Sequence, residues 1–210
     1  MRKILAVLVC LCFLLTCAFT VVTTHSQNRS GSYSVINGVI TDRVTDFIIE
    51  NFSSAESPLK LAKMLTEFSL QNFTYDEKAI GVIQSVNLER FIFDRNFTGV
   101  CLDFATFVKT VFCIVAEHNG WENVACYCAV VLKAFDPKSG HAFNYIAVKD
   151  DFGATTVYEF DTTWDLTRHQ KGQKLQEINV HFVAESGSDV PKEIESFIRR
   201  EFSYNVISIC

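Results

Sequence analysis

The chain has 210 residues, of which 49% are hydrophobic and 20% are charged, so it can bury a substantial core within one domain. This composition excludes extensive disorder. The formal net charge of −5 and the lack of a basic run argue against nucleic acid as a partner.

The first residues of the chain predict export. Met1, Arg2 and Lys3 form a basic start, and residues 4–22 are uncharged and mostly apolar. This pattern is typical of a secretory signal peptide or of an N-terminal membrane anchor, and both readings stay open. We expect a secreted or extracytoplasmic protein that contacts a membrane only through a possible anchor. The expected divisions are a leader over 1–27, a polar linker over 28–38 and a folded domain over 39–210.

Helical periodicity dominates the first part of the domain. The expected helices cover 39–52, a segment that starts at Pro58 with Ser57 as its N-cap, 80–93 and 100–118. The last of these is apolar nearly all round, which is typical of a helix at the centre of a domain. Asn119-Gly120 is expected to end it.

The periodicity changes to two after this helix, as in β-strands. The expected strands cover 124–135, 141–148, 155–164 and 175–183, followed by an amphipathic helix over 191–202 and a short strand over 206–210. Turn signals at 136–140 and 149–153 make the connections short, which implies antiparallel pairing. The order predicts an α+β domain whose buried helix packs on one face of an antiparallel sheet.

Cys101 follows a glycine at the predicted start of the central helix. A thiol in the first turn lies at the positive end of the helix dipole, beside unpaired backbone N–H groups, and this favours the nucleophilic thiolate. The alternative is a small buried apolar residue without chemistry.

His141 and Asp161 are candidate partners for this thiol. A tight turn at 149–153 would place them opposite each other on neighbouring strands, with their Cβ atoms roughly 4.5–5.5 Å apart. If the central helix crosses that face of the sheet, Cys101 can reach the other imidazole nitrogen. Such a set supplies a nucleophile, a base and a group that orients the base, as in acyl-transfer enzymes.

Three motifs occur in order along the chain. They are Gly99-Val100-Cys101-Leu102-Asp103-Phe104-Ala105, His141-Ala142-Phe143-Asn144 and Asp161-Thr162-Thr163-Trp164-Asp165. Together they resemble the G-V-C-x-D-[FY]-A, H-A-W-N and D-x-T-W-D blocks of the transglutaminase-like superfamily. The resemblance covers residues 65–165 and implies a papain-like cysteine-protease fold.

The resemblance also implies a role for each matching residue. Cys101 would be the nucleophile, His141 the general base and acid, and Asp161 the residue that orients the imidazole. Phe143 departs from the family pattern, which has tryptophan at this position. Tyr75 is a candidate for the oxyanion hole by analogy.

The function expected from these residues is acyl transfer through a thioester on protein or peptide substrates. The enzyme would hydrolyse or crosslink peptide or carboxamide bonds, without a cofactor or a metal. A non-catalytic transglutaminase-like module that binds peptide or glycan is the main alternative. A metal site built from Cys126, Cys128 and His141 is a third.

Five cysteines lie outside the leader, namely Cys101, Cys113, Cys126, Cys128 and Cys210. Because five is odd, an exported chain should keep at least one free thiol or pair it between chains. The catalytic interpretation requires Cys101 to stay unpaired. The pairing of the other four is left open, although a bond between Cys126 and Cys128 would be strained.

Overall fold

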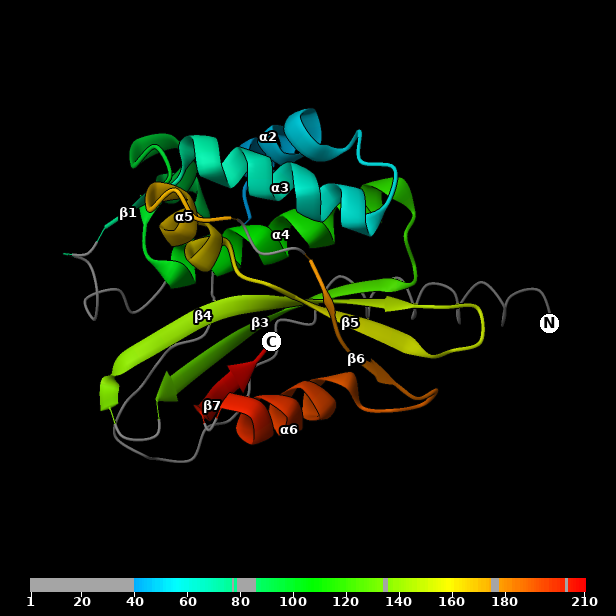
Figure 1. The fold of residues 1–210 in the computed structure, drawn as a ribbon. Helices are drawn as coiled ribbons and strands as arrows, with labels where there is room; N and C mark the ends of the chain where they lie inside the picture. Colours follow the sequence, from blue (N-terminus) through cyan, green and yellow to red (C-terminus); the bar gives the residue numbers. More distant parts are fainter. Residues whose placement is uncertain (1–39, 77, 79–85, 134–135, 175–177, 203) are drawn as a thin grey trace, which may run out of the picture. The chain divides into compact units, whose positions relative to one another are not determined.

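The computed structural model describes residues 40–76, 78, 86–133, 136–174, 178–202 and 204–210 (Figure 1). The leader and linker expected over 1–38 lie outside these residues. The elements before the main sheet are α2 (Asp42–Phe52), α3 (Pro58–Asn72), β1 (Thr74–Tyr75), the π-helical turn η2 (Arg90–Asp94), β2 (Thr98–Gly99) and α4 (Cys101–Asn119). The remaining elements are β3 (Val124–Lys133), β4 (Asp136–Lys149), β5 (Thr155–Phe160), α5 (Thr162–Gln170), β6 (Val180–Ala184), α6 (Val190–Phe202) and β7 (Tyr204–Ile209).

The main sheet has five strands in the order β6-β5-β4-β3-β7, and every neighbouring pair is antiparallel. Helix α4 packs on one face beneath α2 and α3, whereas α6 covers the other face (Figure 1). Alternation along the strands supplies both cores: Ile146 packs with the helical layer around α4, and its neighbour Tyr145 packs with α6. The α+β prediction is confirmed, with the buried helix on an antiparallel sheet.

Sequence signals at the ends of the helices are confirmed. Ser57 accepts a hydrogen bond from the backbone N–H of Lys60 at 3.3 Å, and Pro58 begins α3. Helix α4 ends at Gly120, whose φ of 69° is the left-handed conformation that favours glycine.

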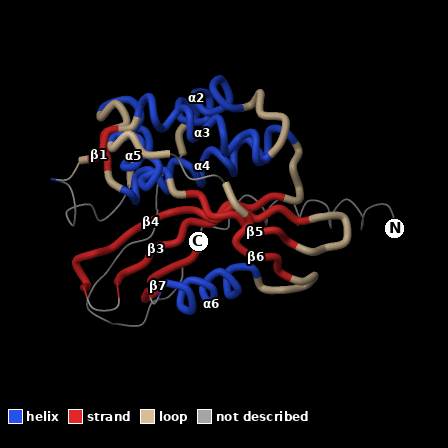
Figure 2. Tube along the Cα trace, viewed as in Figure 1, coloured by secondary structure: helices blue, strands red, loops and turns tan. Residues whose placement is uncertain are grey.

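Two predicted boundaries are wrong. Residues 136–140 belong to β4 rather than to a turn, and β3 and β4 remain paired as far as Lys133 and Asp136. The predicted strand over 155–164 ends at Phe160, and α5 follows it directly (Figure 2). The reason is local: the Asp161 carboxylate caps α5, and Thr162–Trp164 continue as helix despite their strand propensity.

Two other predicted elements lie partly outside the described residues. The first six residues of the helix expected over 80–93 lie outside the described part, and its described end includes the start of η2. The strand expected over 175–183 starts on 175–177, and its described part includes the start of β6. None of the described helices is long and apolar enough to cross a membrane.

A cluster of phenylalanines holds the helical layer on α4. Phe73 stacks on Phe104 with ring centroids 4.5 Å apart, and Phe97 contacts both Phe68 and Phe107. Phe97 adopts a positive φ of 59°, a conformation that costs about 1–2 kcal/mol for a residue with a side chain. Burial of its ring offsets this cost and fixes the approach of the chain to Gly99.

Candidate active site

The start of α4 is held by a glycine and a buried aspartate. The Asp103 carboxylate accepts a hydrogen bond from the backbone N–H of Val100 at 2.9 Å, which closes the first turn around Cys101. A Cβ atom on Gly99 would lie 2.8 Å from the Cβ of Asp103, so only glycine fits here. The Gly99 and Asp103 of the motif are therefore one structural unit that positions Cys101.

Arg95 lies close to this buried carboxylate. Its guanidinium is 3.8 Å from Asp103 and 3.9 Å from Asp76. Burial raises the pKa of Asp103, and the Val100 N–H and the Arg95 charge oppose that shift. Arg95 thus supports the start of the central helix from outside it.

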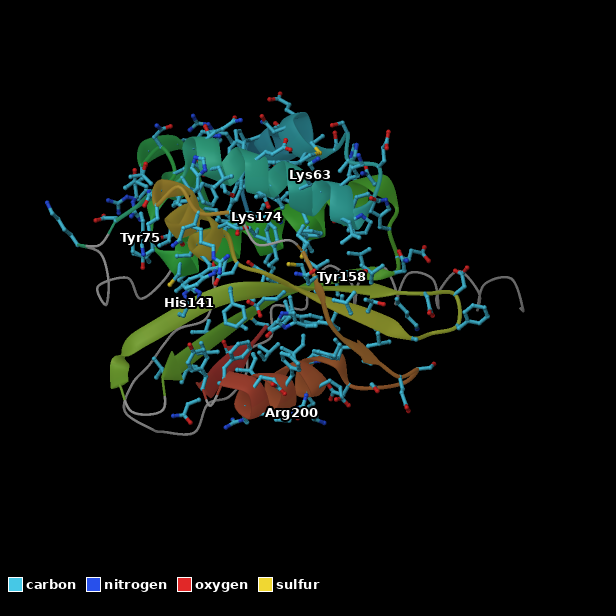
Figure 3. The ribbon with its side chains drawn as sticks, viewed as in Figure 1. Lys63, Tyr75, His141, Tyr158, Lys174 and Arg200 are labelled. Carbon is cyan, nitrogen blue, oxygen red and sulfur yellow. The ribbon has the colours of Figure 1, made fainter. Side chains whose placement is uncertain are left out.

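His141 lies where two strands of the sheet separate. Strands β4 and β5 pair from Lys149 and Thr155 to Asn144 and Phe160, and β4 continues beyond this point without β5. Asp161 follows Phe160 directly and forms the N-cap of α5. In Figure 3, His141 lies at the gap between the sheet and the helical layer.

Both oxygens of Asp161 are engaged. Oδ1 accepts a hydrogen bond from the backbone N–H of Trp164 at 3.0 Å, and Oδ2 lies 2.6 Å from Nε2 of His141. The helix cap therefore fixes the carboxylate, and the carboxylate fixes the imidazole. The side chains of His141 and Asp161 are 32% and 13% exposed, so the pair is accessible from the imidazole side.

The structure brings His141 and Asp161 together, but not by the predicted cross-strand pairing. The observed register would place Thr163 rather than Asp161 opposite His141 if the strands continued. Instead β5 ends, and the turn into α5 carries the carboxylate back to the imidazole. The expectation that Asp161 lies on a strand of the sheet is wrong for the same reason.

Cys101 forms a hydrogen bond with the ring of His141. Burial lowers the pKa of His141, but hydrogen bonds from its ring to Asp161 and Cys101, and their negative charges, outweigh burial and raise the pKa to about 10. The imidazole is therefore protonated at neutral pH. Because Nε2 faces Asp161, Nδ1 is the ring nitrogen left for the thiol.

Asn144 of the second motif connects the sheet to the central helix. Its side chain is fully buried, and its Nδ2 donates to the carbonyl of Ala105 at 2.9 Å. Ala105 lies one helical turn after Cys101. This hydrogen bond therefore sets the position of the thiol relative to β4, the strand that carries His141.

Tyr75 lies near the start of α4 through a second, two-stranded sheet. Strands β1 and β2 are parallel, and Tyr75 pairs with Gly99. Tyr75 also lines the cleft that contains His141, and the two lie on the same side of the domain (Figure 3). Tyr75, the residue suggested by analogy, is therefore paired with the residue two positions before Cys101.

The cleft has a volume of about 1050 Å³. Its walls come from β1, β3, β4, β5, α5, β6, the end of α6 and the start of β7. Its lining residues include His141, Glu159, Asp161, Trp164, Phe202 and Tyr204. Trp164 is 48% exposed and forms part of the wall.

Glu159 and His181 are cleft residues that the sequence reasoning missed. Glu159 Oε2 lies 3.4 Å from Nδ1 of His181. Burial, followed by the charge of Asp161, raises the pKa of Glu159 to about 7, although His141 opposes this shift. Alternation along the predicted strand over 155–164 could have identified Glu159, because it precedes Asp161 by two residues and would share its face of that strand.

The residues of the alternative metal site take separate partners. The Cys126 thiol hydrogen-bonds Asn144, the Cys128 thiol hydrogen-bonds Cys210, and His141 bonds Asp161. Within the described ranges, no group of three or more His, Cys, Asp or Glu side chains is arranged to hold a metal ion.

Comparison with solved structures finds a limited likeness in fold. No protein-family model matches the chain, and no curated protein matches it. A solved structure of a proposed cysteine protease from Cytophaga hutchinsonii is similar, with a TM-score of 0.42 and 16% sequence identity. The match covers 70% of this chain and 52% of that one, so the likeness extends over about half of the solved structure.

Proposed function

We propose that this protein is an exported, transglutaminase-like cysteine enzyme that cleaves or crosslinks peptide or carboxamide bonds through a thioester. One observation carries the proposal: His141 is hydrogen-bonded to Asp161 and also to Cys101 at the start of α4. A thiol, an imidazole and a carboxylate in this order are the parts that nucleophilic acyl transfer needs. The motif order supports the family, and the basic, apolar start of the chain supports export.

The first step is attack by sulfur. The Cys101 sulfur lies at the start of α4, hydrogen-bonded to protonated His141, and as the thiolate it adds to the substrate carbonyl carbon. The carbonyl oxygen becomes an oxyanion. The backbone N–H of Cys101 is among the first in α4, which have no acceptor within the helix, and it stabilises the oxyanion with help from Tyr75.

The second step expels the amine. His141 donates its proton to the departing nitrogen, the C–N bond breaks, and a thioester forms on Cys101. Neutral His141 then takes a proton from water or from a primary amine as that group attacks the thioester. Asp161 holds the ring in one orientation throughout, since its other oxygen is tied to the cap of α5.

The cleft suits an extended polypeptide. Its volume of about 1050 Å³ exceeds what a single side chain would need, and the exposed ring of Trp164 adjoins Asp161. Phe202 and Tyr204 stack on each other at the cleft wall with centroids 5.8 Å apart. Aromatic surfaces of this kind can pack against substrate side chains beside the reacting bond.

Selective alkylation tests the proposal. Cys113 is a matched control, because it lies on the same helix and is exposed. We expect iodoacetamide at pH 7 to modify Cys101 at least tenfold faster than Cys113, as read by peptide mass spectrometry. The selectivity should be lost in His141→Ala. Equal rates at the two thiols in the wild-type protein would contradict the proposal.

Activity assays then identify the reaction. Peptide hydrolysis and incorporation of a fluorescent primary amine into a glutamine-containing protein should be measured on one sample, with Cys101→Ala as the negative control. Turnover in either assay that Cys101→Ala abolishes supports the enzyme. Peptide binding without turnover, together with an unreactive Cys101, would instead indicate the binding module.

A further inference from the structure

Cys128 and Cys210 form a second pair of thiols, separate from the His141–Asp161 pair. Cys128 is on β3 and Cys210 directly follows β7, and the two residues exchange two backbone hydrogen bonds of 2.7 Å and 3.1 Å. The two side chains also hydrogen-bond each other. Cys128 is fully buried, whereas Cys210 is partly exposed.

The backbone already meets the requirement for a disulfide. Antiparallel residues that exchange both hydrogen bonds have Cα atoms about 5.5 Å apart, and disulfides have Cα separations of about 4.4–6.8 Å. Directly opposed side chains lie on one face of the sheet, so the two sulfurs can meet without a movement of the strands. The pair therefore differs from Cys126 and Cys128, which follow each other along one strand.

We propose that Cys128 and Cys210 form a reversible disulfide that joins β7 to β3. Strand β7 is at the edge of the sheet, and its pairing with β3 shifts register between Val130 and Val131. A covalent bond would secure the end of this irregular ladder. Tyr204 at the other end of β7 lines the cleft, so the bond would also hold one wall of the site.

Cys210 and Cys128 have different roles in forming the disulfide. The hydrogen bond from Cys128 lowers the pKa of Cys210 to about 6, and the charge of Lys109 contributes, although burial opposes the shift. The same hydrogen bond and burial raise the pKa of Cys128. Cys210 is thus the accessible thiolate that reacts first, and Cys128 is the buried thiol that closes the bond.

A small disulfide such as oxidised glutathione is the oxidant. The Cys210 thiolate attacks one glutathione sulfur, the glutathione S–S bond breaks, and one glutathione thiolate leaves. Cys128 then gives its proton to solvent, its sulfur attacks the Cys210 sulfur, and the second glutathione thiolate leaves. The cysteine pair loses two electrons, and the oxidant gains them.

The bond would leave Cys101 free. Cys101 packs against the same apolar cluster as this pair, around Ala105, Cys128 and Ala142, but it hydrogen-bonds His141. A bond between Cys128 and Cys210 would therefore prevent either of these thiols from forming a disulfide with Cys101. The inference does not depend on catalysis, because the disulfide would form in a non-catalytic module as well.

Peptide mapping of the full chain tests the inference. After equilibration with oxidised glutathione and blocking with N-ethylmaleimide, trypsin is applied without reductant. The tryptic peptides separate the cysteines: 96–109 holds Cys101, 110–133 holds Cys113, Cys126 and Cys128, and 201–210 holds Cys210. We expect 110–133 linked to 201–210, with fragmentation that assigns the bond to Cys128. The linkage should disappear after dithiothreitol.

Stability provides a second measurement. Reduction should lower the Tm of the wild-type protein by about 5–10 °C, because a disulfide constrains the unfolded chain. Cys113→Ser should behave as wild type, whereas Cys210→Ser should show no redox-dependent shift. Blocked thiols at Cys128 and Cys210 in the oxidised wild-type protein, or a link between 96–109 and 201–210, would overturn the proposal.

Discussion

Gly99 shows how a single side chain shapes the start of α4. The missing Cβ leaves room for the Asp103 carboxylate, which closes the first turn on the N–H of Val100. The motif glycine is therefore required by packing against a helix cap rather than by its own backbone conformation. Gly99 and Asp103 therefore determine the position of Cys101.

Gly99→Ala should lower the free energy of unfolding by about 1–3 kcal/mol, because the new methyl group overlaps the Asp103 side chain. Urea denaturation measures this loss. In the background of Asp103→Gly, which removes the Cβ as well as the carboxylate, the collision partner is gone, so the same substitution should be much less destabilising. Equal losses in both backgrounds would show that the contact is not the cause.

Asp161 acts on His141 through charge as well as geometry. Its carboxylate helps raise the pKa of His141 to about 10, and a protonated imidazole is the form that donates to the leaving amine. The proposed activity should therefore decline as the pH rises through about 10, where His141 loses its proton.

Asp161→Asn keeps the shape but removes the charge. We expect kcat/KM to fall about 100-fold or more, and the alkaline limb of the pH profile to move below that of the wild-type enzyme. The measurement is kcat/KM against pH for both proteins. An unchanged alkaline limb would indicate that Asp161 does not control the protonation of His141.

At the scale of elements, the site depends on how α4, β4 and α5 meet. Helix α4 carries the thiol, β4 carries the imidazole, and the turn from β5 into α5 carries the carboxylate. Asn144 connects the first two through its hydrogen bond to Ala105. The separation of β4 from β5 beyond Asn144 gives His141 its access to the cleft.

Asn144→Ala should loosen this connection. Loss of a buried amide hydrogen bond is expected to lower the free energy of unfolding by about 1–3 kcal/mol. The reaction of Cys101 with iodoacetamide should also slow relative to Cys113 in the same sample, because the thiol and imidazole no longer hold one geometry. A loss of stability with an unchanged ratio of alkylation rates would limit Asn144 to a structural role.

At the scale of the whole molecule, the raised pKa values of Glu159 and His141 each make the folded state less stable as the pH rises. Glu159 binds a proton more tightly in the folded chain, with a pKa near 7 instead of 4.5, and His141 does so with a pKa near 10 instead of 6.5. Each group contributes its full stabilisation below its ordinary pKa, and this stabilisation is lost as the pH rises to its pKa in the folded chain.

The stability supplied by Glu159 and His141 should accordingly fall between about pH 4.5 and pH 10, and the lowered pKa of Cys210 opposes this fall above about pH 6. The share of Glu159 is on the order of 2–3 kcal/mol and is lost between about pH 4.5 and 7. Glu159→Gln should remove the decline in that range and keep the decline toward pH 10. Urea denaturation at a series of pH values provides the test, and an identical profile in the variant would contradict it.

The order of elements could be predicted from the sequence because it depends on local signals. The caps of α3 and the end of α4 are determined within a few residues, and the apolar face of a helix or strand repeats with its own period. The candidate residues Cys101, His141 and Asp161 could be named for a similar reason. Cys101 begins α4 and Asp161 caps α5, whereas His141 lies within β4 directly after residues whose sequence is typical of a turn.

Only the tertiary structure decided how these residues meet. Asp161 reaches His141 because β5 stops and α5 begins, a choice between strand and helix that depends on a cap and not on periodicity. Glu159, the Asn144 connection and the Cys128–Cys210 pair depend on contacts between segments far apart along the chain. Strand register and packing create these contacts, and no local run of residues encodes them.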